Sequence, residues 1–234
     1  MSLARFPWLV WLLALVVPGS ASQHASVLGR SVDGRPIAAV EVRAARPHAA
    51  VLVVGCIHGD EPAGIAVAQA LRHAGPIPGI DLWLIDDLNP DGAAAGTRQN
   101  SHGVDLNRNF PWGWRSAGRP GDQQYPGARA LSEPEAQLAH ALILRLRPRL
   151  TVWFHQPLAV TDRSGGDVAL ERRFAAVSGL PLRRLPRYPG SAATWENHRL
   201  PGSTSFVVEL PAGPVSPARL RRYVRAVRTV AGMA

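Results

Sequence analysis

Three ionisable residues lie at or just beyond the ends of apolar runs that have the composition of buried strands. His155 and Glu209 directly follow their runs, and His58 lies four residues beyond its own. The runs comprise residues 49–54, 150–154 and 206–208. Continuous apolar runs are typical of parallel strands covered on both faces. Since such strands gather functional residues beyond their carboxyl ends, we expect these three side chains to meet at one edge of a sheet.

Glu61 adds a carboxylate three residues after His58, across a predicted strand-to-helix turn. Together with the distant His155, the pair would make a set of two histidines and one glutamate. Zinc takes such ligands in catalytic sites and keeps a fourth position for water. Imidazole and carboxylate ligands suit zinc better than magnesium or calcium.

Each residue of this set also has a structural interpretation. His58 alone could be a polar loop residue, and Asp60 and Glu61 could favour the start of a helix through its dipole. His155 could be a hydrogen-bonded core histidine. Glu209 is harder to explain structurally, because a carboxylate at the end of a buried strand needs a partner.

The elements around these residues predict an α/β fold. Residues 27–42 resemble a hairpin, with Asp33-Gly34 as its tight turn. Strands are expected at 49–54, 82–85, 150–154 and 206–208, and helices at 61–72, 132–146 and from 216 onward. Strands that alternate with helices indicate one domain, with a mostly parallel or mixed central sheet and helices on both faces.

A long segment between the second and third buried strands is rich in Gly, Pro, Asn and Trp. We expect Asn89-Pro90-Asp91-Gly92 to form a turn cluster that opens a loop reaching Gly127. Long loops in compact domains are usually functional. The helix that follows is predicted to begin with a capping box of Ser132 and Glu135, with Pro134 in its first turn.

The motifs in their order along the chain resemble those of the zinc carboxypeptidases of the carboxypeptidase A type. Within that family the chain is most similar to the bacterial murein peptide amidases, which cleave the γ-D-glutamyl–diaminopimelate bond of cell-wall peptides. The resemblance extends from about Gly29 to Pro211 and implies a carboxypeptidase-like fold. It is carried by His58-Gly59-Asp60-Glu61, Asn89-Pro90-Asp91-Gly92, Gly103-Val104-Asp105-Leu106-Asn107-Arg108-Asn109-Phe110, Phe154-His155 and Glu209.

The resemblance implies a role for each matching residue at the metal. His58, Glu61 and His155 would bind one zinc ion per chain. Asp105 would accept the proton of a ligating imidazole and orient the ring. Glu209 would act as general base toward the attacking water and pass the proton to the leaving amine.

Three further residues would contact the substrate. Asn107 and Arg108 would hold its terminal carboxylate, Arg108 through a bidentate pair. Arg98 would polarise the scissile carbonyl and stabilise the oxyanion.

The chain also departs from the family pattern. It is short for the family, and Tyr188 lies about two residues from the position of a tyrosine that closes over the substrate, so no role is carried over to it. The segment 190–195 aligns with the specificity pocket, and its small residues predict a roomy pocket.

Glu196 or Asp162 could contact a substrate amine, although a surface role is favoured for both. Other aromatic residues could line the cleft or simply pack; they are Trp112, Trp114 and Tyr125. His102 is expected to be an ordinary loop histidine.

The formal net charge of +9 arises from 26 arginines and no lysine, against 17 acidic residues. The arginines are scattered and no nucleic-acid-binding motif is present, so we expect no nucleic-acid partner. The excess fits attraction to an anionic substrate or wall, or a compositional bias of the genome. Cys56, the single cysteine, lies in an apolar run and is expected to be a buried thiol.

The N-terminal segment resembles a secretory signal. The apolar run 7–18 follows Arg5 and precedes the small residues 19–22. We therefore expect a signal peptide at 1–22, a catalytic domain at 23–234 and a secreted or periplasmic enzyme; an uncleaved membrane anchor is the alternative. Two other functions remain open: a zinc deacylase of the succinylglutamate desuccinylase or aspartoacylase type, and a non-catalytic wall-binding protein.

Overall fold

The computed structural model describes residues 23–234, so the predicted signal segment lies outside the described residues. Within these described residues, eight strands and six α-helices follow one another. The strands are β1 Gln23–Arg30, β2 Pro36–Val42, β3 Ala49–Val54, β4 Ile80–Ile85, β5 Leu150–His155, β6 Leu158–Asp162, β7 Leu182–Arg183 and β8 Thr204–Pro211. The helices are α1 Ala63–His73, α2 Pro90–Ala95, α3 Pro134–Leu146, α4 Val168–Ser178, α5 Ala192–Arg199 and α6 Pro217–Ala231, with a short 3₁₀ turn η1 at Leu106–Arg108.

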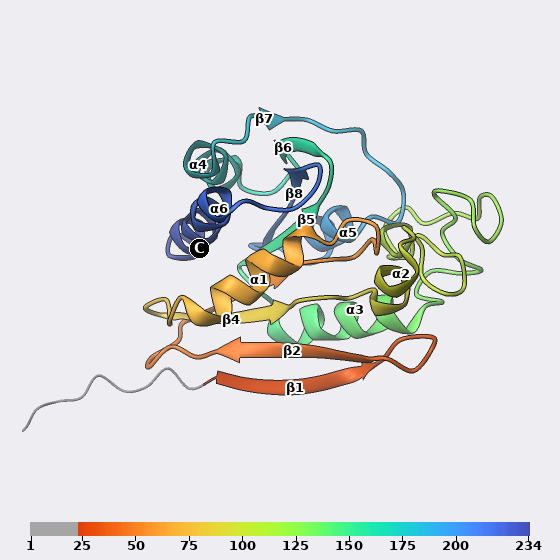
Figure 1. The fold of residues 1–234 in the computed structure, drawn as a ribbon, viewed down its shortest axis with the longest axis horizontal. Helices are drawn as coiled ribbons and strands as arrows, with labels where there is room; N and C mark the ends of the chain where they lie inside the picture. Colours follow the sequence, from red (N-terminus) through yellow and green to blue (C-terminus); the bar gives the residue numbers. More distant parts are fainter. Residues whose placement is uncertain (1–22) are drawn as a thin grey trace, which may run out of the picture.

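All eight strands form one mixed sheet in the order β1-β2-β4-β3-β5-β8-β6-β7. Its centre is parallel, because β4, β3, β5 and β8 run in the same direction. The β1–β2 hairpin is antiparallel and lies at one edge of the sheet, beside β4 (Figure 1). The prediction of a mixed sheet in a single α/β domain is confirmed.

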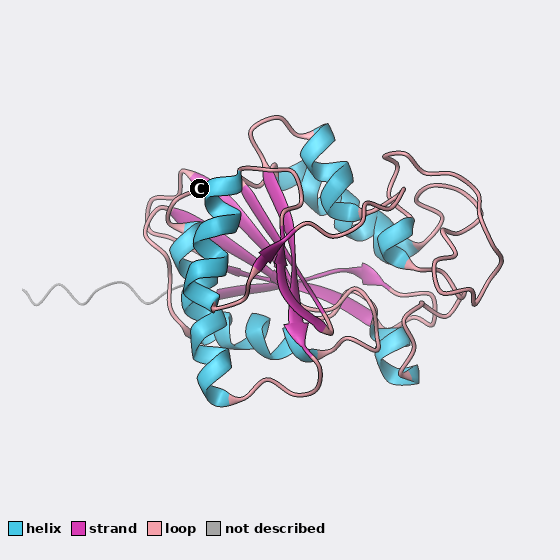
Figure 2. Ribbon diagram, turned by 90° about the horizontal axis from the view of Figure 1, so that it is seen from above, coloured by secondary structure: helices cyan, strands magenta, loops and turns pink. Residues whose placement is uncertain are grey.

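Helices cover both faces of the sheet (Figure 2). On one face, α1, α4 and α6 pack over a core that includes Val51, Val53 and Phe174. On the other face, α3 and α5 cover Leu52, Val54 and Trp153. The alternation along β3 explains the continuous apolar run, since successive side chains of a strand point to opposite faces and both faces are buried.

Several predicted boundaries need correction. α1 begins at Ala63, not at Glu61, which leaves Glu61 in the turn before the helix. The capping box is wrong: the residue before α3 is Glu133, and Ser132 donates a hydrogen bond to it instead of capping the helix. Glu135 is buried and accepts from the Val32 amide and from Asn100. Its carboxylate therefore ties α3 to the hairpin and the long loop.

Four elements of the carboxyl-terminal half were not predicted. These are β6, α4, β7 and α5, between His155 and β8. α4 nevertheless has clear boundary residues: Asp167 accepts from the Ala169 amide at 2.8 Å, and Gly179 ends the helix with φ of 74°. No helix within residues 23–234 is long and apolar enough to cross a membrane.

Candidate active site

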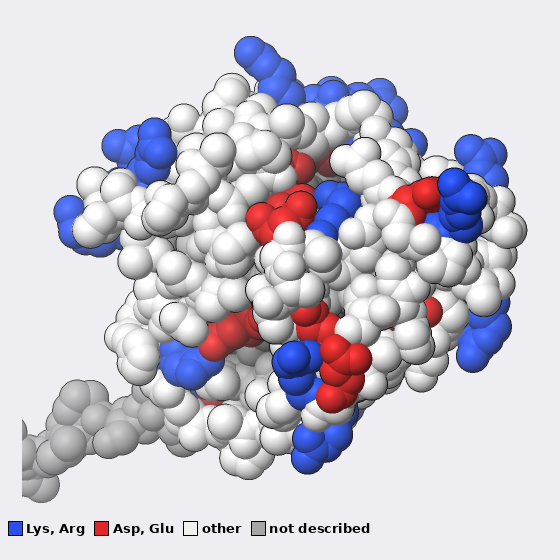
Figure 3. All heavy atoms as spheres, turned by 45° about the vertical axis from the view of Figure 1, so that its right-hand side comes forward, with Lys and Arg blue, Asp and Glu red and all other residues white. Residues whose placement is uncertain are grey.

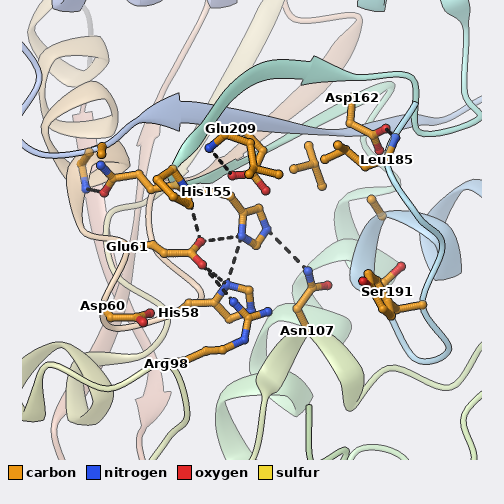
Figure 4. Close-up of a pocket in the computed structure, with 18 of the residues that line it drawn as sticks. His58, Asp60, Glu61, Arg98, Asn107, His155, Asp162, Leu185, Ser191 and Glu209 are labelled. Atoms are coloured by element: carbon orange, nitrogen blue, oxygen red, sulfur yellow. Dashed lines mark hydrogen bonds and ion pairs between the residues drawn. The ribbon is translucent and has the colours of Figure 1, made fainter. Parts of the chain in front are cut away.

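The carboxyl edge of the sheet brings together the four residues predicted for a metal and a base. His155 ends β5 and is the direct register partner of Glu209 on β8. His58 and Glu61 lie in the turn between β3 and α1. Figure 4 shows the four side chains converging, with His155 between Glu209 and the other two.

The atoms of His58, Glu61 and His155 are spaced as zinc ligands are. The two Nδ1 atoms of His58 and His155 are 3.1 Å apart. They lie 3.0 and 2.9 Å, respectively, from the two carboxylate oxygens of Glu61. Bond lengths of about 2.0–2.1 Å around a tetrahedral zinc put neighbouring ligands about 3.3 Å apart. Two facing imidazole nitrogens can share at most one proton, whereas a cation between them would accept a lone pair from each, so the donor set fits zinc.

Asp105 and Arg98 form hydrogen bonds to the ligand residues His58 and Glu61. Asp105 Oδ1 accepts from His58 Nε2 at 3.1 Å, which leaves Nδ1 of His58 facing the ligand cluster. Arg98 donates to Asp105 Oδ2 at 3.0 Å and to Glu61 Oε1 at 2.9 Å. Asp105 is fully buried, whereas Arg98 reaches the cavity wall. The prediction that these residues lie together is met, and their catalytic roles remain predictions.

Neighbouring charges shift the titration of the cluster. Burial disfavours the ionised form of Glu61 and by itself would raise its pKa. The contacts of Glu61 with His155 and His58 have the larger effect and hold the pKa of its carboxyl well below the usual range. Burial likewise opposes the ionised form of Asp105, where His58 and Arg98 lower the pKa. At Glu209, burial prevails and raises the pKa, as a proton acceptor needs.

Asn107 and Arg108 lie beside the metal cluster and line the same cavity. The side-chain oxygen of Asn107 accepts from the Ala192 amide at 2.9 Å, which fixes the side chain against the start of α5. Arg108 donates to the Asn107 carbonyl, and its buried Nε has no partner among residues 23–234. The Tyr188 ring stacks on the guanidinium at 4.2 Å. A buried cation with a free donor is the arrangement expected of a carboxylate site.

These residues line one cavity of about 970 Å³. Its walls contain every predicted site residue except Asp105, which lies behind His58. Ser191, Ala193 and Thr194 of the 190–195 segment form part of the wall. Tyr188 also lines the cavity and is partly exposed.

The Asn-Pro-Asp-Gly motif shapes the loop that carries Arg98. Asn89 caps α2 by accepting from the Gly92 amide at 3.0 Å, and it donates to the Arg98 carbonyl at 3.2 Å. The motif therefore begins a short helix, where only a turn was predicted. Gly59 packs against this helix so closely that a Cβ there would lie 1.9 Å from the Gly92 carbonyl carbon. The glycine thus lets the His58 turn approach the Arg98 loop.

Two acidic residues expected at the surface are buried. Glu196 is wholly buried beneath the sheet and accepts from Thr151 at 2.7 Å and from Ser203 at 3.1 Å. Asp162 is 3 % exposed and lines the cavity. The surface interpretation was wrong for both, because the sequence did not reveal β6 and α5, which carry them inward.

The remaining candidates lie outside the cavity wall. Trp112, Trp114 and Tyr125 are not among the described residues that line it, and Trp112 stacks on His198 with ring centres 4.0 Å apart. His102 pairs with Glu133 at 2.8 Å. Cys56 is buried as predicted, and burial raises the pKa of its thiol.

Gln156 and Arg187 are cavity residues that sequence reasoning missed. The Gln156 amide donates to Glu61 at 3.1 Å, and its side chain joins the Ala63 amide to the Pro211 carbonyl. Its position directly after His155 was the available signal. Arg187 pairs with Asp162 at 2.7 Å, a contact between β6 and the segment before α5 that only the fold reveals.

Comparisons with known proteins agree with this geometry. The zinc carboxypeptidase family profile matches residues 77–157. Murein peptide amidase A of Vibrio campbellii is 35% identical over 205 residues, covering 80% of this chain and 79% of the relative. The protein of the same name from Escherichia coli K12 is 35% identical over 182 residues, 71% of this chain and 74% of the relative.

Solved structures extend the match to the fold. The crystal structure of the murein-tripeptide amidase MpaA from Escherichia coli O157 has a TM-score of 0.70 and 27% identity; the match covers 89% of this chain and 91% of that one. Carboxypeptidase A from Helicoverpa armigera has a TM-score of 0.76 at 19% identity, covers 93% of this chain and 70% of its own, and supports the fold alone. The chain therefore belongs to the zinc carboxypeptidase family and is a hydrolase of that family, similar to the murein peptide amidases.

Proposed function

We propose that this protein is a secreted or periplasmic zinc peptidase that hydrolyses an amide bond next to a free carboxylate. The proposed bond is the γ-D-glutamyl–diaminopimelate bond of cell-wall peptides. The similarity to murein peptide amidases supports the peptide class. The apolar run 7–18 and its small-residue flank support export.

One observation carries the proposal: a metal-ligand set, a carboxylate with a raised pKa and a carboxylate-binding pair all line one cavity. Glu209, Asn107 and Arg108 share that wall with the ligand cluster. A cavity of about 970 Å³ has room for a peptide and not only for a small acyl amino acid. This favours the peptidase over the deacylase.

The chain's own residues would then divide the work. A zinc ion held by His58, Glu61 and His155 would supply Lewis acidity at the scissile carbonyl when bound. Glu209 takes a proton from the attacking water and returns it to the leaving nitrogen. Arg98 donates to the oxygen that gains negative charge.

Asn107 and Arg108, which bind the substrate's carboxylate, orient the substrate. Arg108 and the side-chain amide of Asn107 donate to the terminal carboxylate, which sets the scissile bond at a fixed distance from the ligand cluster. Asp105 holds the His58 ring in one orientation through the 3.1 Å contact at Nε2.

Product mass analysis tests the proposal. The zinc-loaded protein is incubated with the tripeptide L-alanyl-γ-D-glutamyl-diaminopimelate and, separately, with N-succinylglutamate and N-acetylaspartate. Release of free diaminopimelate alone supports the proposed function. Release of succinate or acetate would favour the deacylase, and no turnover of any substrate would favour a non-catalytic binding protein.

Export has its own test. N-terminal sequencing of the exported protein should find a mature chain beginning near Ser22 or Gln23. An intact Met1 in a membrane fraction would favour an anchor.

No nucleic-acid partner is proposed. In the face shown in Figure 3, basic side chains lie mainly at the rim, and near its centre acidic and basic groups lie side by side.

A further inference from the structure

The cavity wall opposite the ligand residues His58, Glu61 and His155 carries an ion pair. Asp162, at the end of β6, and Arg187, in the segment between β7 and α5, lie 2.7 Å apart and both line the cavity. Figure 4 shows Asp162 across the cavity from Glu61 and His58, with Glu209 nearer the cluster. None of the mechanistic steps above uses this pair.

The wall around the pair is built from apolar and small residues. Leu185 and Val207 offer apolar surface, and Ser191 and Ala193 leave space beside it. A side chain of several methylene groups can lie along such a wall. Its far end would then meet the Asp162–Arg187 pair.

The carboxylate of Asp162 is fixed in place. Its Oδ1 accepts from the Leu185 amide at 2.8 Å, and its Oδ2 accepts from Ser164 Oγ at 2.7 Å and from Arg187. A carboxylate offers about four acceptor positions. One position therefore remains, on a side chain that is only 4% exposed.

Arg187 has N–H donors that form no hydrogen bond within the described residues. Its Nη1 donates to Asp162 and to the Leu185 carbonyl, and its Nη2 donates to the Arg163 carbonyl. A guanidinium carries five N–H groups, so two have no acceptor among residues 23–234. Two parallel donors match a carboxylate.

We propose that Asp162 and Arg187 form a specificity site for a substrate side chain that ends in both an ammonium and a carboxylate. Arg187 would donate to the carboxylate and Asp162 would accept from the ammonium. The paired wall charges cancel, so a zwitterionic end keeps the wall neutral while a lone charge does not. The inference rests on the proposed function and deepens it, because diaminopimelate has such a side-chain end.

Three tripeptides that differ only in this end test the site. One ends in meso-diaminopimelate, one in L-lysine, which lacks the distal carboxylate, and one in L-2-aminopimelate, which lacks the distal amine. For the wild type, we expect kcat/KM on the diaminopimelate peptide to exceed each of the others at least tenfold.

Two variants separate the two contacts. Arg187→Gln should reduce the diaminopimelate-to-lysine ratio of kcat/KM at least fivefold, and Asp162→Asn should do the same to the diaminopimelate-to-aminopimelate ratio. A purely structural pair would lower all three rates together and leave both ratios unchanged. Arg72→Gln is the matched control, because Arg72 also pairs with an aspartate, Asp86, is 28 % exposed against 31 % for Arg187, and lies outside the cavity wall. Its ratios should equal those of the wild type.

Binding separates this inference from the proposed function. Titration calorimetry of the zinc-loaded protein with free diaminopimelate, lysine and 2-aminopimelate should show tighter binding of diaminopimelate, lost in Arg187→Gln. Tighter binding of diaminopimelate would support the specificity site even if no tripeptide were cleaved. A failure to cleave any tripeptide would overturn only the proposed function. Equal binding of the three amino acids, or ratios unchanged by Arg187→Gln in a variant of normal melting temperature, would overturn the specificity site.

Discussion

At the scale of single residues, the site depends on charges that are buried together and compensate one another. Glu61 alone contacts His58, His155 and Arg98 within 3.0 Å. Opposite charges that are buried together compensate one another, so removing one group leaves the others uncompensated. Substitutions here should therefore be read through metal content as well as activity.

His155→Ala should abolish stoichiometric zinc binding together with activity, because it removes one of three ligands. Asp105→Asn should instead keep zinc at saturating metal and weaken its affinity about 10–100-fold, as expected when a residue that orients a ligand is changed. Metal analysis after dialysis against a series of chelator concentrations measures both. Full zinc occupancy in His155→Ala would remove His155 from the ligand set.

A separate prediction concerns Arg108, which is proposed to bind the substrate's terminal carboxylate. Losing a hydrogen bond to a charged group costs about 1.5–3 kcal/mol, so Arg108→Ala should lower kcat/KM at least tenfold. Amidation of the substrate's terminal carboxylate should have a similar effect on the wild type and little further effect on the variant. Equal rates on free and amidated peptides would contradict the assignment.

Glu196 gives a pH-dependent prediction away from the reaction. Burial raises its pKa to about 7, so the folded state holds this proton more tightly than the unfolded state. The contribution of Glu196 to wild-type stability should therefore fall between about pH 4.5 and 7 and then level off, at a cost of about 3 kcal/mol. Glu196→Gln cannot ionise and should gain stability relative to the wild type only as the pH rises through that range. Urea unfolding at pH 5 and pH 8 checks it, and a difference that does not vary with pH would contradict the shift.

At the scale of elements, the turn between β3 and α1 must fit against α2. A methyl group on Gly59 would overlap the Gly92 backbone, so one of the two segments must move. Gly59→Ala should destabilise the fold by about 1–3 kcal/mol and lower zinc affinity, because His58 is the preceding residue. Gly232→Ala, where the nearest atom lies at 3.6 Å, is the control and should change neither. Thermal unfolding and zinc titration of both variants decide the matter.

The sequence predicted the elements whose patterns are local and regular. Buried strands such as β3 and β5 were found because both faces are apolar, and the carboxyl-edge rule then grouped His58, His155 and Glu209. β6 and α5 were missed because their sequences lack a strong period. Asp162 and Glu196 were consequently misplaced, and the Asp162–Arg187 contact depends on strand pairing that no local pattern encodes.

At the scale of the whole molecule, the parallel centre of the sheet sets where chemistry can occur. The ligand groups that follow β3 and end β5 meet Glu209 of β8 at one edge of the sheet, and the hairpin and helices support that edge. Since zinc would bind the folded chain and not the dispersed ligands of the unfolded one, added zinc should raise the melting temperature of metal-free protein. The size of the rise should depend on zinc concentration and vanish in His155→Ala. Calorimetry of the two proteins tests this, and an equal rise in both would place the stabilising metal elsewhere.

We propose that Glu209 moves the proton at this site. Glu209→Gln keeps the shape and hydrogen-bonding capacity of the side chain but cannot accept a proton. The decisive measurement is kcat of this variant on the diaminopimelate tripeptide, with zinc content and melting temperature determined on the same preparation. We predict retained zinc, normal stability and a kcat lower by about 10²–10⁴-fold, the usual contribution of general acid–base catalysis. Retained zinc and normal stability with an unchanged kcat would contradict the account.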